Sequence, residues 1–244
     1  MSGLLNALAF LTRLPVPAME TRLENTVVWL PVVGVLLGVM LAIVDLGLRA
    51  LPVSSLVIST VLVVLWLLLT GALHADGLMD TFDAVFSHAT PERRLEIMRD
   101  PRSGAFGVVG IVSILVLKIA SLDALPVGVR VGSLVLAPTL GRWAIVLLAT
   151  AFPYGRPSGM GAPLKMAATP RALTLASLVP ILACAVMWPW GPLVGALAAV
   201  AVLLLGRWLV SLLPGLTGDC YGAGCEIVET VVLLAAGPLA HVLA

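Results

Sequence analysis

The sequence predicts an all-α fold: a polytopic bundle of about seven transmembrane helices, preceded by a short N-terminal interfacial or re-entrant helix. Composition indicates this first, because 60% of the 244 residues are hydrophobic and only 11% are charged. A water-soluble domain needs about a quarter of its residues charged to cover its surface. The second observation is a series of long apolar stretches, and the third is a one-sided distribution of Lys and Arg.

Seven apolar stretches reach the roughly 20 residues that a helix needs to cross the hydrocarbon core. Only helices cross as single segments without leaving backbone groups unpaired. The first 17 residues are apolar but short and end in prolines, so we expect them to lie in the interface or dip partway into the membrane. No internal repeat is visible, which indicates a single transmembrane domain over residues 1–244. The predicted spans are residues 27–50, 54–73, 104–123, 129–151, 172–190, 192–213 and 226–243.

The basic residues predict a cytoplasmic N-terminus and an external C-terminus. With that orientation only Arg49 and Arg130 lie outside, whereas nine basic residues lie inside. The acidic segments 74–103 and 214–229 then face the cytoplasm, where we expect them to meet at one pocket. The nine are Arg13, Arg22, Arg93, Arg94, Arg99, Arg102, Arg156, Lys165 and Arg171.

Charge and cysteine content exclude several classes of function. The net charge is +1 and no basic block stands out, so we expect no nucleic-acid partner. Cys184, Cys220 and Cys225 form no CxxC pair, so neither a disulfide framework nor a zinc site is indicated.

The segment "HADGLMDTFDAVF" places three carboxylates at the end of a hydrophobic stretch. Asp76, Asp80 and Asp83 are spaced i, i+4 and i+7, so they share one face of a helix. Mutual repulsion of three anions is relieved by a divalent cation, and Mg²⁺ takes carboxylate, water and phosphate oxygens. The alternative is that Asp76 caps a helix and the other two are solvated. His74 points away from this face, which favours a neutral histidine lying at the interface.

A second acidic cluster lies in "GLTGDCYGAGCEIVETV", before the last predicted span. Asp219 and Glu226 are i and i+7, with Gly222 on the same stripe. Gly218 and Gly222 would let a ligand or another backbone approach closely. The alternative for Glu226 and Glu229 is the first turn of a helix, where the macrodipole favours anions.

Two basic features could contact a phosphate. In "RRLEIMRDPRSGAFG", Asp100, Arg102 and Ser103 precede Gly104 and Gly107 at the start of a span, where backbone N–H groups and an arginine can cradle an anion.

Arg142 lies near the middle of its span and needs a buried partner, either a substrate phosphate or a structural ion pair. Lys118 and Arg207 are expected to extend toward the ends of their spans. In the loop 152–171, Arg156, Gly159, Gly161 and Lys165 could contact an anionic substrate, although anchoring charge is the simpler interpretation.

Carboxylates, a magnesium ion and basic groups on one side of a bundle are suited to transfer of a phosphate-linked group. A cation-coupled transporter is the alternative from another class of function. Transporters, however, tend to hold ionisable groups near the membrane midplane, on broken helices in two symmetry-related halves of the chain. A purely structural membrane protein would not need the acidic clusters.

These motifs resemble the cobalamin synthase family, adenosylcobinamide-GDP ribazoletransferase. The matching pieces are "FLTRLPVP", "HADGLMDTFDAVF", "RRLEIMRDPRSGAFG", "RPSGMG" and "GLTGDCYGAGCEIVE", in the family's order over nearly the whole chain. Ala84 and Pro101 depart from residues common in the family. The D-G start is also similar to CDP-alcohol phosphotransferases, lipid enzymes that carry Ala-Arg soon after it, where this chain has Met79 and Asp80; they supply the alternative enzyme.

The resemblance implies a phosphotransferase for substituted phosphate groups in the prokaryotic cytoplasmic membrane. It would join α-ribazole, or its 5′-phosphate, to adenosylcobinamide-GDP and release GMP. Asp76, Asp80, Asp83, Asp219 and Glu226 are then expected to bind Mg²⁺, with Asp83 or Glu226 as the base. Arg102 and Arg142 would offset charge on GMP, and substrate contacts would come from His74, Asp100, Ser103, Gly104, Gly218 and Gly222. Homo-oligomers or association with other corrinoid-pathway enzymes stay open.

Overall fold

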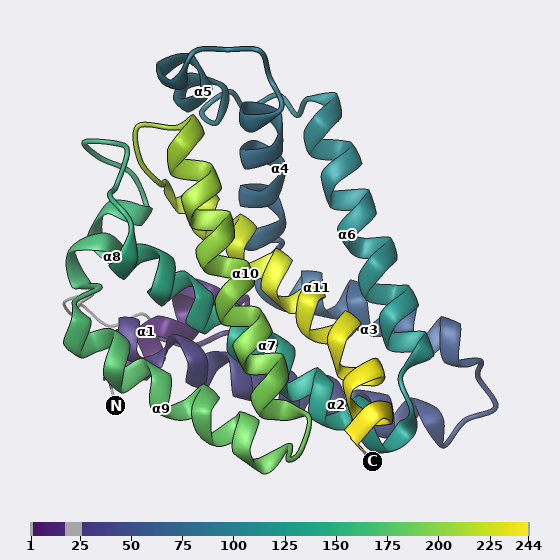
Figure 1. Ribbon diagram of the computed structural model, residues 1–244. Helices are drawn as coiled ribbons and strands as arrows, with labels where there is room; N and C mark the ends of the chain where they lie inside the picture. Colours follow the sequence, from purple (N-terminus) through teal and green to yellow (C-terminus); the bar gives the residue numbers. More distant parts are fainter. Residues whose placement is uncertain (1, 18–25, 244) are drawn as a thin grey trace.

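The computed structural model describes residues 2–17 and 26–243, and most of them are helical (Figure 1). Within these residues, β structure is limited to one isolated bridge between Tyr154 and Leu216. The all-α prediction is confirmed. Of the basic residues used to predict orientation, Arg22 lies outside the described residues. The elements are α1 (Ser2–Leu11), η2 (Val27–Trp29), α2 (Leu30–Arg49), α3 (Ser55–Thr70), α4 (Leu73–Val85), α5 (Pro91–Ile97), α6 (Ala105–Ala124), α7 (Val127–Ala151), α8 (Gly161–Ala167), α9 (Pro170–Val186), α10 (Gly191–Leu212) and α11 (Gly218–Leu243).

Five of the described helical segments are long and apolar enough to cross a membrane: η2 with α2, and α6, α7, α10 and α11. Two bent pairs raise the number to as many as seven, α3 with α4 at 91° and α8 with α9 at 94°. Large apolar side chains are exposed along these helices, where lipid would cover them; examples are Ile43, Leu68, Val109, Ile181 and Leu182. The chain is therefore a polytopic membrane bundle, although the predicted spans 54–73 and 172–190 are short helices that each meet a neighbour nearly at a right angle.

The bend between α3 and α4 is made by two consecutive left-handed residues. Gly71 has φ 59° and Ala72 has φ 55°. Glycine adopts this conformation freely, whereas an L-residue with a β-carbon does so at a cost of roughly 1–2 kcal/mol. The backbone N–H of Arg13 donates to the carbonyl of Leu69 at 2.7 Å, which ties the segment after α1 to this bend. The bend turns α4 away from α3 and places His74 and Asp76 in its first turns.

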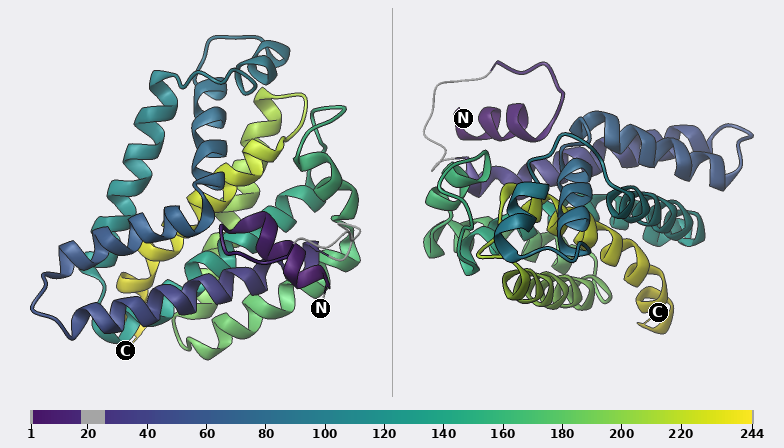
Figure 2. Two further views of the ribbon diagram at one scale, coloured as in Figure 1. Left: turned by 180° about the vertical axis from the view of Figure 1, so that it is seen from behind. Right: turned by 90° about the horizontal axis from the view of Figure 1, so that it is seen from above.

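Helix α7 lies at the centre of the bundle and packs against α2, α9, α10 and α11. Gly34 and Gly38 of α2 face its backbone, and a β-carbon at either position would collide with that backbone. Small residues four apart are a common means of close packing between membrane helices. The short helix α1 packs on the outside of α2 through the buried Ala7 and Leu11 (Figure 2). It matches the predicted N-terminal helix, while its depth in the membrane stays a prediction.

The start of the last helix differs from the prediction. α11 begins at Gly218, eight residues before the predicted start, so "GDCYGAGCE" is helical. The predicted span covered only the continuous apolar stretch. Gly222 and Gly224 are buried inside the helix, and Gly222 lets the backbone of a neighbouring helix approach, as predicted. Glu226 and Glu229 therefore lie more than two turns inside α11, and the first-turn macrodipole explanation for them is wrong.

Candidate active site

Helices α4 and α11 cross in direct backbone contact. A β-carbon added at Gly77 would lie 2.8 Å from the carbonyl oxygen of Asp219, and one added at Gly222 would lie 3.1 Å from that of His74. Because the two acidic segments are carried by these helices, the crossing brings them together, as expected. Glycine at both positions is what allows this approach.

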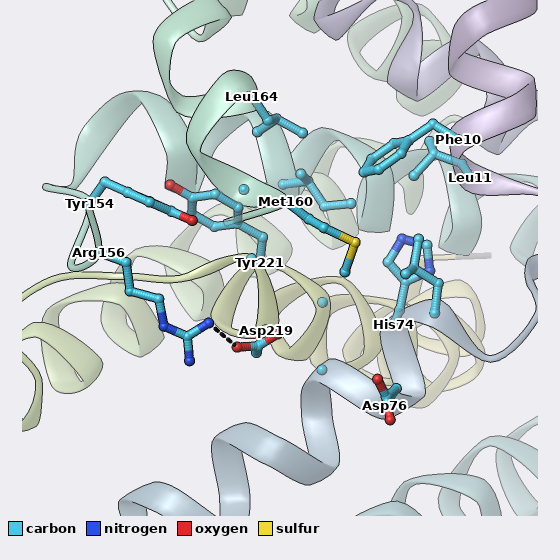
Figure 3. A pocket seen from close by; sticks show the side chains of 16 residues that line it. Phe10, Leu11, His74, Asp76, Tyr154, Arg156, Met160, Leu164, Asp219 and Tyr221 are labelled. Carbon is cyan, nitrogen blue, oxygen red and sulfur yellow. Dashed lines mark ion pairs between the residues drawn. The ribbon is translucent and has the colours of Figure 1, made fainter. Parts of the chain in front are cut away.

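A cavity of about 100 Å³ opens beside the crossing (Figure 3). A single water needs roughly 10–15 Å³ of such volume, so the space holds several waters or a small ring system. Asp76 and Asp219 lie at one side of it, and Gly218 and Gly222 contribute backbone to its wall. The other walls are apolar or aromatic and comprise Phe10, Leu11, Leu73, Ile145, Tyr154, Met160, Leu164 and Tyr221.

Arg156, for which the sequence favours an anchoring charge over a contact with an anionic substrate, lies in this site. Its guanidinium lies 3.1 Å from Asp219 Oδ2. Backbone bonds hold its loop in place, because Gly155 N donates to Leu216 O and Leu216 N donates to Pro153 O, each at 2.8 Å. The signals for a role in the site are the glycines beside this arginine and the "RPSGMG" stretch, one of the motifs on which the family resemblance rests.

The neighbouring loop fixes the carboxylate and an aromatic side chain. The Thr217 hydroxyl donates to Asp219 Oδ2 at 3.1 Å, so this oxygen has two partners. Tyr154, from the same loop as Arg156, lies in the cavity wall, where burial raises the pKa of its phenol. The Tyr154 hydroxyl therefore stays neutral at physiological pH.

Asp76 and Asp80 are carboxyl groups without a basic partner. Neither forms an ion pair with any Lys or Arg in the described part of the chain; Asp76 is exposed and Asp80 is partly buried. Asp219, Asp76 and Asp83 all lie within electrostatic range of Asp80. Among the described residues, no three His, Cys, Asp or Glu side chains are arranged to hold a metal ion. The acids are thus gathered on one side of the crossing but are not arranged as a three-ligand metal site.

Asp83 caps the start of α6, and its predicted role in the metal site stays a prediction. Its two oxygens accept hydrogen bonds from Gly104 N at 2.7 Å and Gly107 N at 2.8 Å, at the start of α6. These are the backbone donors that the sequence offered to a phosphate. The carboxylate therefore satisfies the first turn of a neighbouring helix, which gives Asp83 a structural function.

Asp100, Arg102 and Ser103 lie on the exposed connection before α6. Arg102 pairs with Asp100 at 2.6 Å, and its side chain is 87% exposed. The bonds from Arg102 lower the pKa of Asp100 to about 2, so both groups stay ionised. Neither they nor Ser103 belong to the cavity wall.

Four ionised side chains form a buried cluster inside the bundle: Lys118, Arg142, Glu226 and Glu229. Lys118 Nζ lies 2.6 Å from Glu226 and 2.5 Å from Glu229, and Arg142 pairs with the other oxygen of Glu229. Two positive and two negative charges balance, as buried charges require. Lys118 therefore does not extend to the end of its span, and Arg142 forms the structural ion pair. Glu226 faces this cluster rather than the cavity wall.

His74 is buried in the cavity wall, and its depth relative to the membrane interface stays a prediction. It is 3% exposed. Neither ring nitrogen has a hydrogen-bond partner among the described residues. In Figure 3 its ring lies beside Phe10 and Leu11, on the apolar side of the cavity.

Comparison with known proteins gives a consistent family. A family model described as cobalamin-5-phosphate synthase matches residues 3–237. The chain is 41% identical to an adenosylcobinamide-GDP ribazoletransferase of Roseiflexus sp., over 93% of this chain and 86% of that protein. Relatives with the same name from Stutzerimonas stutzeri and Thermosynechococcus vestitus are each 42% identical, over 96% and 95% of this chain and 97% and 94% of theirs. No solved structure matches the chain.

Proposed function

Because this chain belongs to the cobalamin-5-phosphate synthase family, we propose that it catalyses the reaction for which its relatives are named. It would join α-ribazole, or α-ribazole 5′-phosphate, to adenosylcobinamide-GDP, releasing GMP and forming adenosylcobalamin or its 5′-phosphate. This is the late nucleotide-loop step of vitamin B12 synthesis. The observation that supports it most is the α4–α11 crossing, which brings Asp76, Asp219 and Arg156 together at one cavity.

The donor set fits magnesium. Asp76, Asp80 and Asp219 supply hard carboxylate oxygens, and the first two have no basic partner in the described chain. Mg²⁺ usually keeps several waters and takes only one or two carboxylates together with substrate phosphates. A site without a three-carboxylate cage is therefore compatible with it. When bound, the ion would neutralise charge on the diphosphate of the substrate. We leave Asp83 and Glu226 out of the ligand set, because both are held by other groups.

The reaction exchanges one phosphorus–oxygen bond for another. The 3′-hydroxyl oxygen of ribazole bonds to the phosphorus that carries the aminopropanol arm of cobinamide, and the diphosphate bond to GMP breaks. The hydroxyl proton passes to a carboxylate at the crossing. Arg156 would offset charge on the departing GMP, in place of the exposed Arg102 and the buried, paired Arg142.

The orientation is part of the proposal. The excess of Lys and Arg on one side would place the cavity on the cytoplasmic face of the bacterial inner membrane, where a soluble nucleotide substrate is available. A homo-oligomer, or a complex with other enzymes that handle corrinoids, is compatible with this placement.

The test is GMP release by the purified protein supplied with adenosylcobinamide-GDP, α-ribazole and Mg²⁺. EDTA should abolish the reaction and added Mg²⁺ restore it. Asp80→Asn should lower kcat by about 100-fold or more while the protein still inserts in the membrane, since a metal-bound charge is lost. Asp123→Asn, at the exposed far end of α6, is the matched control and should behave as wild type.

Three results would oppose the proposal. A folded protein that releases no GMP would favour the cation-coupled transporter. Turnover of a CDP-alcohol lipid substrate instead would favour the lipid enzyme. Full activity of Asp80→Asn would remove Asp80 from the metal site.

A further inference from the structure

We propose that the apolar side of the cavity is the subsite for the base of α-ribazole, and that the His74 ring donates a hydrogen bond to the unsubstituted nitrogen of that base. The inference rests on the proposed function, because it assigns one of its substrates to one part of the site. The ligand of this subsite is the planar benzimidazole of α-ribazole.

The first observation is a buried polar group without a partner. His74 is 3% exposed, and both ring nitrogens lack hydrogen bonds among the described residues. Buried polar side chains are nearly always hydrogen-bonded, and an unsatisfied one costs about 1–3 kcal/mol. Since His74 lies in the wall of a cavity with room for a ring system, a ligand in that cavity is the natural partner.

The second observation is the character of the surrounding walls. Tyr154 and Tyr221 approach each other with ring centroids 6.4 Å apart, and Phe10 and Leu11 of α1 lie on the His74 side (Figure 3). Aromatic and aliphatic walls favour a flat apolar ring. The carboxylates lie at the other side of the same cavity, so a base seated by His74 would direct its ribose toward Asp76 and Asp219.

The walls discriminate among the rings of the two substrates. A corrinoid is far too large for a cavity of about 100 Å³. Guanine carries several donors and acceptors on its edge, and on the His74 side, where Phe10 and Leu11 offer no polar side chain, most of them would be unsatisfied. The benzimidazole of α-ribazole has one free ring nitrogen, an acceptor, which matches the single donor that a neutral histidine offers.

A chemical double-mutant cycle tests the hydrogen bond. The probes are α-ribazole and its indole analogue, in which a C–H group replaces the free ring nitrogen. With the wild type, the KM of the analogue should be about 10-fold higher, the cost of leaving one buried donor unpaired. His74→Ala should raise the KM of α-ribazole by a similar factor and bind both nucleosides equally, with the KM of adenosylcobinamide-GDP unchanged.

Two further variants keep the test decisive. His88→Ala removes an exposed histidine beyond the end of α4 and should retain the full discrimination. Phe10→Ala trims a wall residue that is 39% exposed, so folding should tolerate it. It should raise the KM of both nucleosides equally, because it removes apolar contact but no hydrogen bond. If His74→Ala does not fold, Phe10→Ala tests the cavity wall in its place.

The outcomes separate this inference from the proposed function. If the wild type releases no GMP with either nucleoside, the proposed function fails. If it releases GMP but accepts both nucleosides with the same KM, or if His74→Ala still discriminates between them, the subsite lies elsewhere. An unchanged KM in Phe10→Ala would also overturn the assignment.

Discussion

Gly77 on α4 lies against the backbone of Asp219 on α11, with space for no side chain between them. A methyl group at residue 77 would sit 2.8 Å from the Asp219 carbonyl oxygen, closer than a β-carbon tolerates. The absence of a side chain at residue 77 therefore allows the two acidic segments to lie in direct contact.

Gly77→Ala should separate the helices and weaken the site. We expect kcat to fall by about 10-fold or more, because misplacing reacting groups by about 1 Å can cost 100-fold. The measurement is GMP release together with thermal unfolding in detergent. Gly47→Ala is the matched control, since nothing lies within 4 Å of its added β-carbon. Equal activity of the two variants would show that the close crossing is dispensable.

Removing Arg156 should slow turnover more than it weakens substrate binding. Arg156→Gln keeps a polar side chain, shorter than arginine, but loses the charge paired with Asp219. If the guanidinium acts on charge that develops in the transition state, kcat should fall about 100-fold with little change in KM. Arg171→Gln, exposed at the start of α9, serves as the control. A rise in KM alone would limit Arg156 to ground-state binding.

Breaking the buried charge cluster should destabilise the fold. Lys118→Met leaves Glu226 without its ion pair, at an expected cost of about 3–5 kcal/mol. Thermal unfolding in detergent should show a lower Tm. The double variant Lys118→Met, Glu226→Gln removes one charge of each sign and should recover much of the loss. If the double variant is no more stable than the single one, charge balance is not what the cluster provides.

Asp83 should act on stability rather than on metal affinity. Asp83→Ala removes the acceptor for Gly104 and Gly107 N–H, and loss of such a cap costs about 0.5–2 kcal/mol. The magnesium concentration for half-maximal activity should stay that of the wild type. A marked rise in that magnesium concentration in Asp83→Ala would show that Asp83 is a ligand of the metal ion.

Ala72→Gly should stabilise the protein. Ala72 has φ 55°, a conformation that glycine adopts without the roughly 1–2 kcal/mol cost of a β-carbon. Part of this gain is lost to the greater freedom of glycine in the unfolded chain, so we expect about 0.5–1 kcal/mol. Differential scanning fluorimetry in detergent would detect the higher Tm, and a lower Tm would mean that the methyl group contributes packing.

Composition and residue spacing were sufficient to predict the helical class and the meeting of the two acidic segments. The spacing of Asp76 and Asp80 places both on one helix face whatever the tertiary packing. The predicted start of α11 is eight residues too late, because only the continuous apolar stretch was counted as a span. The prediction that glycine on this stripe lets another backbone approach is confirmed, since Gly222 packs against the backbone of His74 on α4.

The partners of individual charges could not be predicted, because they come from distant parts of the chain. Lys118 meets Glu226 across 108 residues, and Asp83 meets Gly104 across 21. Arg156 reaches Asp219 because its loop bonds to Leu216, a contact between two irregular segments. Such pairings depend on how the helices cross, and a single sequence carries no direct signal for them.

The position of α1 has a practical consequence for handling the protein. Since Phe10 and Leu11 form part of the cavity wall, shortening the amino terminus would open the pocket to solvent even if the remaining chain inserted normally. Affinity tags and fluorescent fusions are better attached at the other end, where Val242 is 77% exposed and the cavity lining is not involved.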